Sequence, residues 1–378
     1  MARIIVAGYM VRNPIGGSLW ADLQYVLGLR RLKHDAYFFE EFGWPNSCYD
    51  YANDRISDDA TWGAHVIRRL MRRFDLNHRW VYRDADGKYH GLSANRMHEI
   101  ISSADLLLNL SGATWFDEFE RIPYRMFVDR DPGFTQFGCA NDAKILQRLT
   151  RRHTHFSIFA VRIGQTGCPV PTLGLRWHPT RQPVVLSEWP MQFDPHAKTF
   201  TTVMTWDAYG SIRYQGQVYG PKGTEFLKII KLPSRTSQPL EVAVGEALHK
   251  KIAAHGWHVN NSVVVSRTPE TYRDYIQKSR GEFSIAKHCY VKTRSGWFSD
   301  RSAVYLATGK PVVVQETGFS DWLPLGEGLL AFSNEDEALA ALERVNGDYR
   351  RHCEAARAIA LEFFDSDRVL RDLLSAWQ

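Results

Sequence analysis

Four polar residues, Ser299, Asp300, Arg301 and Ser302, precede a short apolar run that ends at Gly309. A serine or aspartate at a helix start accepts hydrogen bonds from backbone amides, and glycine readily adopts the left-handed conformation that ends a helix. The segment therefore predicts a short helix. Its free amides, its dipole and the Arg301 guanidinium would together bind phosphate or another anion. The alternative is that Ser299 and Asp300 only cap the helix, and the Asp300 carboxylate disfavours a phosphate placed directly on it.

A second group of chemically competent residues, Asp129, Arg130 and Asp131, ends the predicted strand YRMFVDRD, and a Pro-Gly pair turns the chain after them. A carboxylate or histidine that faces a cleft can take a proton from a reacting hydroxyl, so Asp131 and Asp129 are candidate general bases. The alternative is that one aspartate caps the next turn while the other pairs with Arg130. His155 is a further candidate, although a lone histidine at a strand end is more often a structural, hydrogen-bonded residue.

The remaining chain predicts two series of alternating strands and helices that would position these residues. The first series begins with a strand at 3–8, a helix from about Ser18 to Leu32 and the strand AYFFEE, and the second begins with TFTTVMTWD and includes a strand at SVVVS. Between them, prolines recur every few residues and indicate a linker. We therefore expect domains at 1–185 and 186–360, and a C-terminal helix at 361–378 that packs back toward the first domain.

The composition is that of a globular protein that does not span a membrane. Of 378 residues, 44% are hydrophobic and 24% charged, and no long uncharged apolar run occurs. The net charge of +5 is too small to mark a nucleic-acid binder, but it favours an anionic ligand. Five scattered cysteines without a CxxC pair indicate neither a disulfide framework nor a zinc site, so we expect a cytoplasmic location. No metal-binding motif is found, and we predict metal independence.

The run SGWFSDRSAVYLATGKPVVVQETG, followed by GEGLLAF, DEALAAL and YRRHCEAARAIALEFFDSDRVLRDLL, resembles glycosyltransferases of the GT-B fold. The resemblance covers nearly the whole chain and is strongest in its C-terminal half. It implies an α/β architecture with two Rossmann-like, doubly wound parallel-sheet domains facing across a cleft. It also implies a nucleotide-sugar donor in the C-terminal domain, a UDP-sugar above all, an acceptor in the N-terminal domain, and no bound cofactor.

The resemblance assigns donor-binding residues beyond Ser299, Asp300, Arg301 and Ser302. Lys222, in YGPKGTEFLK, matches a lysine that neutralises the donor diphosphate, and Arg213 is a weaker partner because a predicted hairpin intervenes. The alternative for Lys222 is a surface lysine in a turn.

The same resemblance places the donor sugar and the nucleobase. Gln315, Glu316 and Thr317 follow the strand at 311–314 and would recognise the sugar, unless they form an ordinary polar loop, and Arg267 would lie beside the nucleobase. Many retaining members carry two glutamates near this helix, where this chain has Gly296 and Val304. The stereochemistry of transfer is therefore left open.

Candidate acceptor-binding residues follow two predicted strands of the first domain. Gly16 and Gly17 allow a ligand to approach the backbone closely, and Asn109 and Ser111 end the strand DLLLNLSG. The glycine pattern is not GxGxxG, so a bound dinucleotide is not indicated.

The leading hypothesis is transfer of a sugar from a nucleoside-diphosphate sugar to an acceptor hydroxyl, on a small molecule or on DNA. Three alternatives remain: a phage-type enzyme that glycosylates hydroxymethylpyrimidines in DNA, a sugar-nucleotide epimerase or hydrolase, and a catalytically silent protein that binds sugar nucleotides.

Overall fold

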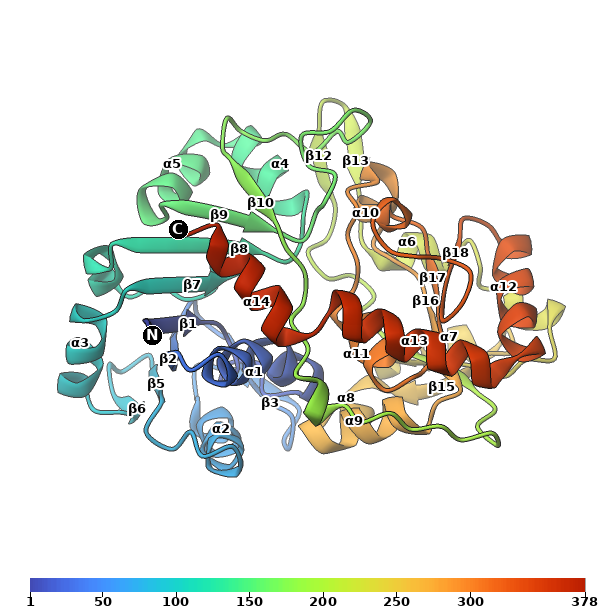
Figure 1. The fold of residues 1–378 in the computed structure, drawn as a ribbon, viewed down its shortest axis with the longest axis horizontal. Coiled ribbons are helices and arrows are strands. Elements are labelled where there is room, and N and C mark those ends of the chain that lie inside the picture. The colour runs from blue at the N-terminus through green and yellow to red at the C-terminus, as the bar shows by residue number, and fades with distance from the viewer. Residues whose placement is uncertain (378) are drawn as a thin grey trace.

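The computed structural model describes residues 1–377, in which strands and helices alternate to form two parallel sheets (Figure 1). The first sheet has the order β10-β9-β8-β7-β1-β2-β5-β6, and only the β5–β6 pair is antiparallel. Its strands are β1 (Arg3–Ala7), β2 (Asp35–Glu41), β5 (Trp80–Arg83), β6 (Tyr89–Gly91), β7 (Leu106–Leu110), β8 (Tyr124–Asp129), β9 (His155–Ile158) and β10 (Trp177–Pro179). Around it lie α1 (Gly16–Arg31), α2 (Thr61–Arg73), α3 (Ala94–Ser102), α4 (Phe134–Asn141), α5 (Ala143–Arg152) and the hairpin β3 (Cys48–Asp50) and β4 (Arg55–Ser57).

The second sheet is entirely parallel and has the order β15-β14-β11-β16-β17-β18. Its strands are β11 (Phe200–Val203), β14 (Leu240–Val244), β15 (His258–Asn261), β16 (Gly281–Ser284), β17 (Val312–Gln315) and β18 (Leu329–Phe332). Its helices are α6 (Lys222–Phe226), α7 (His249–Ala253), α8 (Ser262–Val265), α9 (Pro269–Lys278), α10 (His288–Thr293), α11 (Asp300–Ala307), α12 (Glu335–Gly347) and α13 (Tyr349–Phe363). A separate hairpin, β12 (Ile212–Tyr214) and β13 (Gln217–Tyr219), precedes α6.

The central strands are apolar on both faces because helices cover both sides of a parallel sheet. All five residues of β7 and all four of β17 are buried. Both sheets are doubly wound, and the strand order reverses beside β1 in the first and beside β11 in the second. Ligands of such sheets bind at the carboxyl ends of the strands, next to this reversal.

One predicted strand is wrong. The segment SVVVS forms the short helix α8, because β15 ends at Asn261 and the Asn261 side chain accepts a hydrogen bond from the Val263 amide (2.9 Å). Asparagine is a strong helix N-cap, and it prevails here over the strand preference of three consecutive valines.

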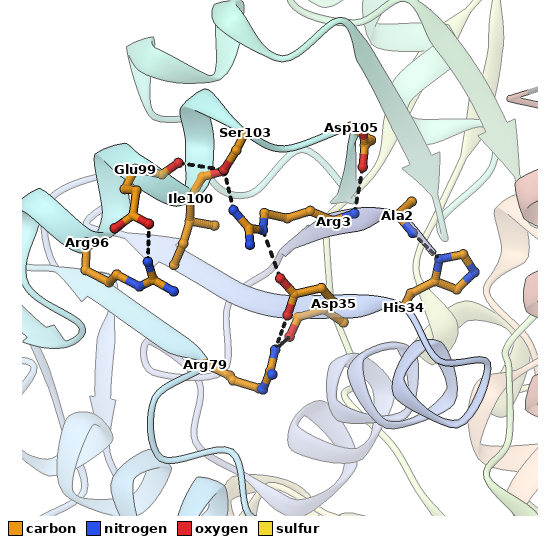
Figure 2. A network of polar contacts seen from close by, with 11 residues as sticks. Ala2, Arg3, His34, Asp35, Arg79, Arg96, Glu99, Ile100, Ser103 and Asp105 are labelled. Carbon is orange, nitrogen blue, oxygen red and sulfur yellow. Dashed lines mark hydrogen bonds and ion pairs between the residues drawn. The ribbon is translucent and has the colours of Figure 1, made fainter.

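Charges at the amino edge of the first sheet are paired with one another. The Asp35 carboxylate accepts hydrogen bonds from Arg3 (2.8 Å) and from Arg79 (2.5 Å), which ties β1 to β2 and to the residue before β5 (Figure 2). This edge lies opposite the carboxyl ends of the strands. Among residues 1–377, no helix is both long and apolar enough to cross a membrane.

The last helix, α14 (Ser366–Ser375), packs against α1 of the first half (Figure 1). A Cβ atom at Gly28 of α1 would lie only 2.5 Å from Leu370 Cδ1, so the two helices touch where α1 has no side chain. Arg31 and Asp367 form an ion pair beside this contact (3.1 Å).

Replacing Gly28 with valine should therefore separate α14 from α1 and lower the thermal unfolding midpoint, at a cost of about 1–3 kcal/mol for overpacking. Differential scanning calorimetry would measure the shift. Gly138→Ala in α4 is the control, because a Cβ there meets nothing within 4 Å. An unchanged midpoint in Gly28→Val would show that the α1–α14 contact does not matter for stability.

Candidate functional site

A cleft of about 540 Å³ lies between the two halves, at the carboxyl ends of strands from both sheets. Tyr9 follows β1, and Asp131 follows β8, on the first side. Met204 follows β11 on the second side, where Lys222 and Asp300 also line the cleft. Both reversals of strand order therefore face one cavity, which is the place where the topology predicts a ligand.

Lys222, the first residue of α6, points into this cleft and is only 8% exposed. Its ammonium group has no hydrogen-bond or ion-pair partner among residues 1–377. Burial, followed by repulsion from Arg301 and Lys287, lowers the pKa of Lys222 well below its ordinary value, although attraction by the Glu282 and Asp300 carboxylates opposes this shift. A buried cation without a counter-ion is costly, and an anion in the cleft would remove most of that cost.

The start of α11 lies beside Lys222. Ser299 is the N-cap, and both Ser299 Oγ (3.2 Å) and Asp300 Oδ1 (2.8 Å) accept a hydrogen bond from the Arg301 amide. Ser299, Asp300 and Arg301 all line the cleft. Ser302 is buried and lines a small hollow behind the helix, together with Gln315 and Thr317.

Arg301 is held in place by three acceptors of the second sheet. It donates to the Glu282 carboxylate (2.6 Å), the Val203 carbonyl (2.7 Å) and Ser284 Oγ (2.5 Å). Although burial opposes its charge, the Glu282 carboxylate raises the pKa of Arg301, so the guanidinium is permanently charged. Arg301 thus contributes a fixed positive potential to the cleft, whereas Lys222 is the cation without a partner.

Asp131 lines the cleft and contacts three side chains of the opposite half. Its carboxylate accepts hydrogen bonds from Lys287, Tyr290 and Tyr209, the last at 3.1 Å. Burial alone would raise the pKa of the Asp131 carboxyl, but the Lys287 ammonium and the Tyr290 hydroxyl outweigh it and hold that pKa below its usual range. Asp131 is therefore an ionised carboxylate facing the site.

Asp129 lies behind Asp131 and does not line the cleft. It accepts hydrogen bonds from Gln136 Nε2 (2.8 Å) and from the Asp131 amide (3.0 Å), and burial raises its pKa to about 6. Asp129 thus holds the turn that presents Asp131. Arg130 pairs with Asp22 (2.6 Å), so neither aspartate takes it as a partner in the way the sequence suggested.

His155 lies at the opposite edge of the sheet from the cleft, so it is not placed where a general base would have to be. It is the first residue of β9, at the amino edge of the sheet and not at the carboxyl edge. Its Nδ1 lies 2.9 Å from Thr154 Oγ1, and its ring packs against Tyr124. The expectation that His155 faces the cleft is therefore not met, because the strand begins at this histidine.

Neither Gln315, the last residue of β17, nor the loop that follows it lines the cleft. Gln315 donates to Glu225 (2.6 Å) and accepts from the Ala286 amide (3.2 Å), while Thr317 donates to the Trp297 carbonyl. Glu316 accepts a hydrogen bond from the amide of Gly318. The physical reason is the strand order: β17 lies one strand beyond the β11–β16 pair where the sheet reverses.

Arg213 and Arg267 are exposed and do not line the cleft. Arg213 lies on the β12–β13 hairpin, which packs against α4, and its carbonyl accepts a hydrogen bond from Asn141 (2.7 Å). In place of Arg267, the preceding helix α8 presents Ser262 and Val263 to the cleft.

Of the four residues predicted to bind the acceptor, only Gly17 lines the cleft. Gly17 lines the cleft, while Gly16 donates to the Ser266 carbonyl (2.5 Å) and lets α1 begin against the second half. Asn109 is buried and bonded to His153 Nε2 (3.0 Å), outside the cleft. Ser111 accepts from Arg130 Nε (3.1 Å) and lines a neighbouring hollow.

Sequence reasoning missed several residues that line the cleft. Tyr9, Asn13, Tyr209 and Lys287 were not assigned roles, although Lys287 lies just after the carboxyl end of β16, beside the reversal of the second sheet. This position after β16 could have identified Lys287 as a cleft residue from the sequence. Within residues 1–377, no three His, Cys, Asp or Glu side chains gather in a way that could hold a metal ion.

Two parallel, doubly wound sheets that face each other across a cleft, with a C-terminal helix returning to the first half, define the GT-B fold, which confirms the predicted fold class. No family model and no curated protein matches the sequence.

Among solved structures, an alpha-glucosyltransferase in complex with UDP is 9% identical, with a TM-score of 0.60 over 100% of both chains. HepE of Anabaena in complex with UDP and glucose is 12% identical, with a TM-score of 0.57 over 100% of both chains. Sucrose-phosphate synthase from Thermosynechococcus elongatus is 10% identical, with a TM-score of 0.57 over 99% of this chain and 98% of that one. At these identities the likeness shows the fold.

The contacts of Asp131 lead to a test. Lys287→Met removes the cation but leaves the carboxyl buried, so the pKa of Asp131 should rise and the carboxyl should protonate at a higher pH. Titration of isotope-labelled aspartate carboxyls by NMR, assigned with Asp131→Asn, would measure the change. Lys292→Met, on the helix that begins just after Lys287, is the control, because Lys292 donates to Gln217 and not to a carboxylate. An unaltered Asp131 titration in Lys287→Met would contradict the ion pair.

Proposed function

We propose that this protein transfers a sugar from a nucleoside-diphosphate sugar, a UDP-sugar in particular, to a hydroxyl group of an acceptor, without a metal ion. The observation that carries the proposal is the Lys222 ammonium, which is buried in the interdomain cleft beside Arg301 and has no anionic partner. A sugar nucleotide supplies two phosphates, and its leaving group gains negative charge as the sugar departs. Fixed cations and amide groups stabilise that charge most when water is excluded.

The cleft offers a different environment for each part of the donor. We assign the diphosphate to Lys222 and the start of α11, and the nucleoside to Ser262 and Val263 of α8. The Asp300 carboxylate accepts hydrogen bonds but repels phosphate, so we assign it to donor hydroxyl groups. With this assignment, the diphosphate lies near Lys222 and does not contact the Asp300 carboxylate, which would repel it.

For a transfer that inverts the anomeric carbon, we assign the general base to Asp131. The acceptor oxygen attacks the anomeric carbon, the bond from that carbon to the diphosphate oxygen breaks, and the hydroxyl proton passes to the Asp131 carboxylate. Asp131 is ionised and faces the cleft, as a base must be. Lys287 and Tyr290 position it.

Isothermal titration with UDP, GDP and TDP tests the donor site. At least one nucleotide should bind, and Lys222→Met should weaken it about tenfold to hundredfold, the range for lost hydrogen bonds to charged groups. The same substitution should raise the thermal unfolding midpoint of the free protein, because it removes an unpaired buried charge. Lys231→Met is the control, since Lys231 is an exposed lysine of the same segment.

Undiminished nucleotide affinity in Lys222→Met would remove the proposed phosphate site. Turnover then separates the remaining alternatives. Sugar release or isomerisation from the donor alone indicates a hydrolase or an epimerase, and nucleotide binding without turnover on any acceptor indicates a silent binding protein.

Metal independence is tested with EDTA. Because side-chain cations are assigned to the diphosphate, chelation should leave both UDP affinity and turnover unchanged, and added magnesium should not raise either. Loss of activity in EDTA that magnesium restores would contradict this part of the proposal.

A further inference from the structure

Two more hollows continue from the donor cleft across the first half of the molecule. The middle hollow, of about 680 Å³, shares Tyr9, Asn13, Tyr209 and Val263 with the cleft. The distal hollow, of about 570 Å³, shares Trp44, Ser111, Gly112 and Ala113 with the middle hollow. The three cavities thus adjoin in sequence, from the donor cleft to α5.

The middle hollow is mostly apolar and open to solvent, although Arg12 also lines it and its guanidinium lies over one face of the Trp44 ring (4.8 Å). Trp44 is 54% exposed and Ile56 is 63% exposed, and both line it together with Tyr49. Large exposed apolar side chains that gather around a cavity commonly mark a binding site. A flat or apolar ring system suits these walls, because aromatic faces stack on planar groups.

The distal hollow carries uncompensated positive charge. Arg148 and Arg152 lie one turn apart on α5 and both line it. Neither guanidinium donates to a carboxylate or carbonyl within residues 1–377. Arg152 lies over the Trp115 ring (4.8 Å), and burial together with repulsion from Arg148 lowers its pKa.

The carboxylates nearby do not neutralise these arginines. Glu41 lines the same hollow, but it pairs with Arg83 and accepts a hydrogen bond from the Trp115 amide (3.2 Å). Glu120 pairs with Arg151 at 3.2 Å on the exposed side of α5. Asp117 and Glu41 both attract the Arg152 guanidinium and so oppose the lowering of its pKa, but neither forms an ion pair with it.

The helix that carries the arginines is itself unusual. No residue of α5 is buried, although the helix is strongly amphipathic, and its apolar residues Ile145 and Leu149 face the distal hollow. An amphipathic helix ordinarily buries its apolar face. Here that face and the two arginines together form one wall of an open cavity.

We propose that the acceptor carries an anionic group, a phosphate or a carboxylate, which binds Arg148 and Arg152, and an apolar ring that lies against Trp44 in the middle hollow. The acceptor hydroxyl then extends past Tyr209 toward Asp131. This inference rests on the proposed function, since it takes the cleft as the place where the sugar is transferred. The chemistry that recognises the acceptor is charge-assisted hydrogen bonding to paired guanidinium groups, next to aromatic surface.

The test uses three ring-bearing probes, naphthol, naphthoate and naphthyl phosphate, added to protein whose donor cleft is saturated with UDP. Binding is followed by quenching of tryptophan fluorescence and by calorimetry. The two anionic probes should bind at least about tenfold more tightly than naphthol, the effect of one hydrogen bond to a charged group. The double variant Arg148→Gln/Arg152→Gln should abolish that difference while leaving naphthol binding unchanged.

Two further variants serve as controls. Arg151→Gln, on the same turn but paired with Glu120, should bind all probes as the native protein does, and Trp44→Ala should weaken all three. Equal affinity for charged and neutral probes would overturn the proposal, as would undiminished anion binding in the double variant or equal loss in Arg151→Gln. UDP affinity measured on every variant reports folding and tests the donor site separately, so failure of the donor proposal is visible independently.

The source of the anionic group is resolved by competition. A short single-stranded oligonucleotide that displaces naphthyl phosphate from the native protein, with a steep salt dependence, assigns the anionic group to a nucleic-acid strand. This outcome would parallel the alpha-glucosyltransferase that has been solved with UDP and a 13-mer DNA. Failure of the oligonucleotide to compete, with naphthyl phosphate or naphthoate still bound through the arginines, assigns it to a small molecule.

Discussion

The unpaired positive charge of Lys222 is the constraint around which the cleft is organised. A folded chain rarely buries an ammonium group without a counter-ion, because the lost hydration is not replaced. Three largely buried arginines are paired: Arg12 with Glu40 (3.0 Å), Arg130 with Asp22 and Arg301 with Glu282. Among residues 1–377, the buried Lys310 amine also lacks a hydrogen-bond partner, but it does not line the cleft. Lys222 is left without such a match at the one place where both sheets reverse their strand order. The unpaired charge lowers the stability of the free protein, and an anionic ligand that binds beside Lys222 restores that stability. The cleft therefore favours ligands that carry negative charge.

The two halves meet through side chains that also define the site. Asp131 of the first half contacts Lys287, Tyr290 and Tyr209 of the second, and the Trp297 indole donates to the Arg130 carbonyl (3.1 Å). Because these bonds cross the cleft, the position of Asp131, the proposed base, depends on how the halves are arranged. Asp129 and Gln136 add rigidity from behind, since they fix the turn on which Asp131 stands. The Asp131 carboxylate is thus held from both sides of the molecule.

Local signals in the sequence predicted those parts of the fold and site that depend on neighbouring residues. The α11 helix begins at its Ser299 cap and ends before Gly309, which adopts a left-handed conformation (φ +70°), as its residue types indicated. Lys222 was also predicted correctly as a cleft residue, because the short motif around it marks the start of α6, and the start of α6 lies at the cleft. Long-range geometry was not predictable. Gln315 looks like a sugar-binding residue by type, yet Glu225, ninety positions away, takes its amide. The Asn261 cap shows that a local signal also fails when two local preferences compete.

The contacts that keep Asp131 ionised also limit its reactivity. Each hydrogen bond from Lys287, Tyr290 or Tyr209 stabilises the carboxylate, and a stabilised carboxylate takes up a proton less readily. Tyr209 differs from the other two donors, because the residue is 61% exposed and lines both the donor cleft and the middle hollow. An acceptor hydroxyl that approaches from the middle hollow meets the Tyr209 hydroxyl first. If Asp131 is the base, as proposed, replacing that one bond would restore its basicity while Lys287 and Tyr290 keep it in place, so arrival of the acceptor and activation of the base would be the same event.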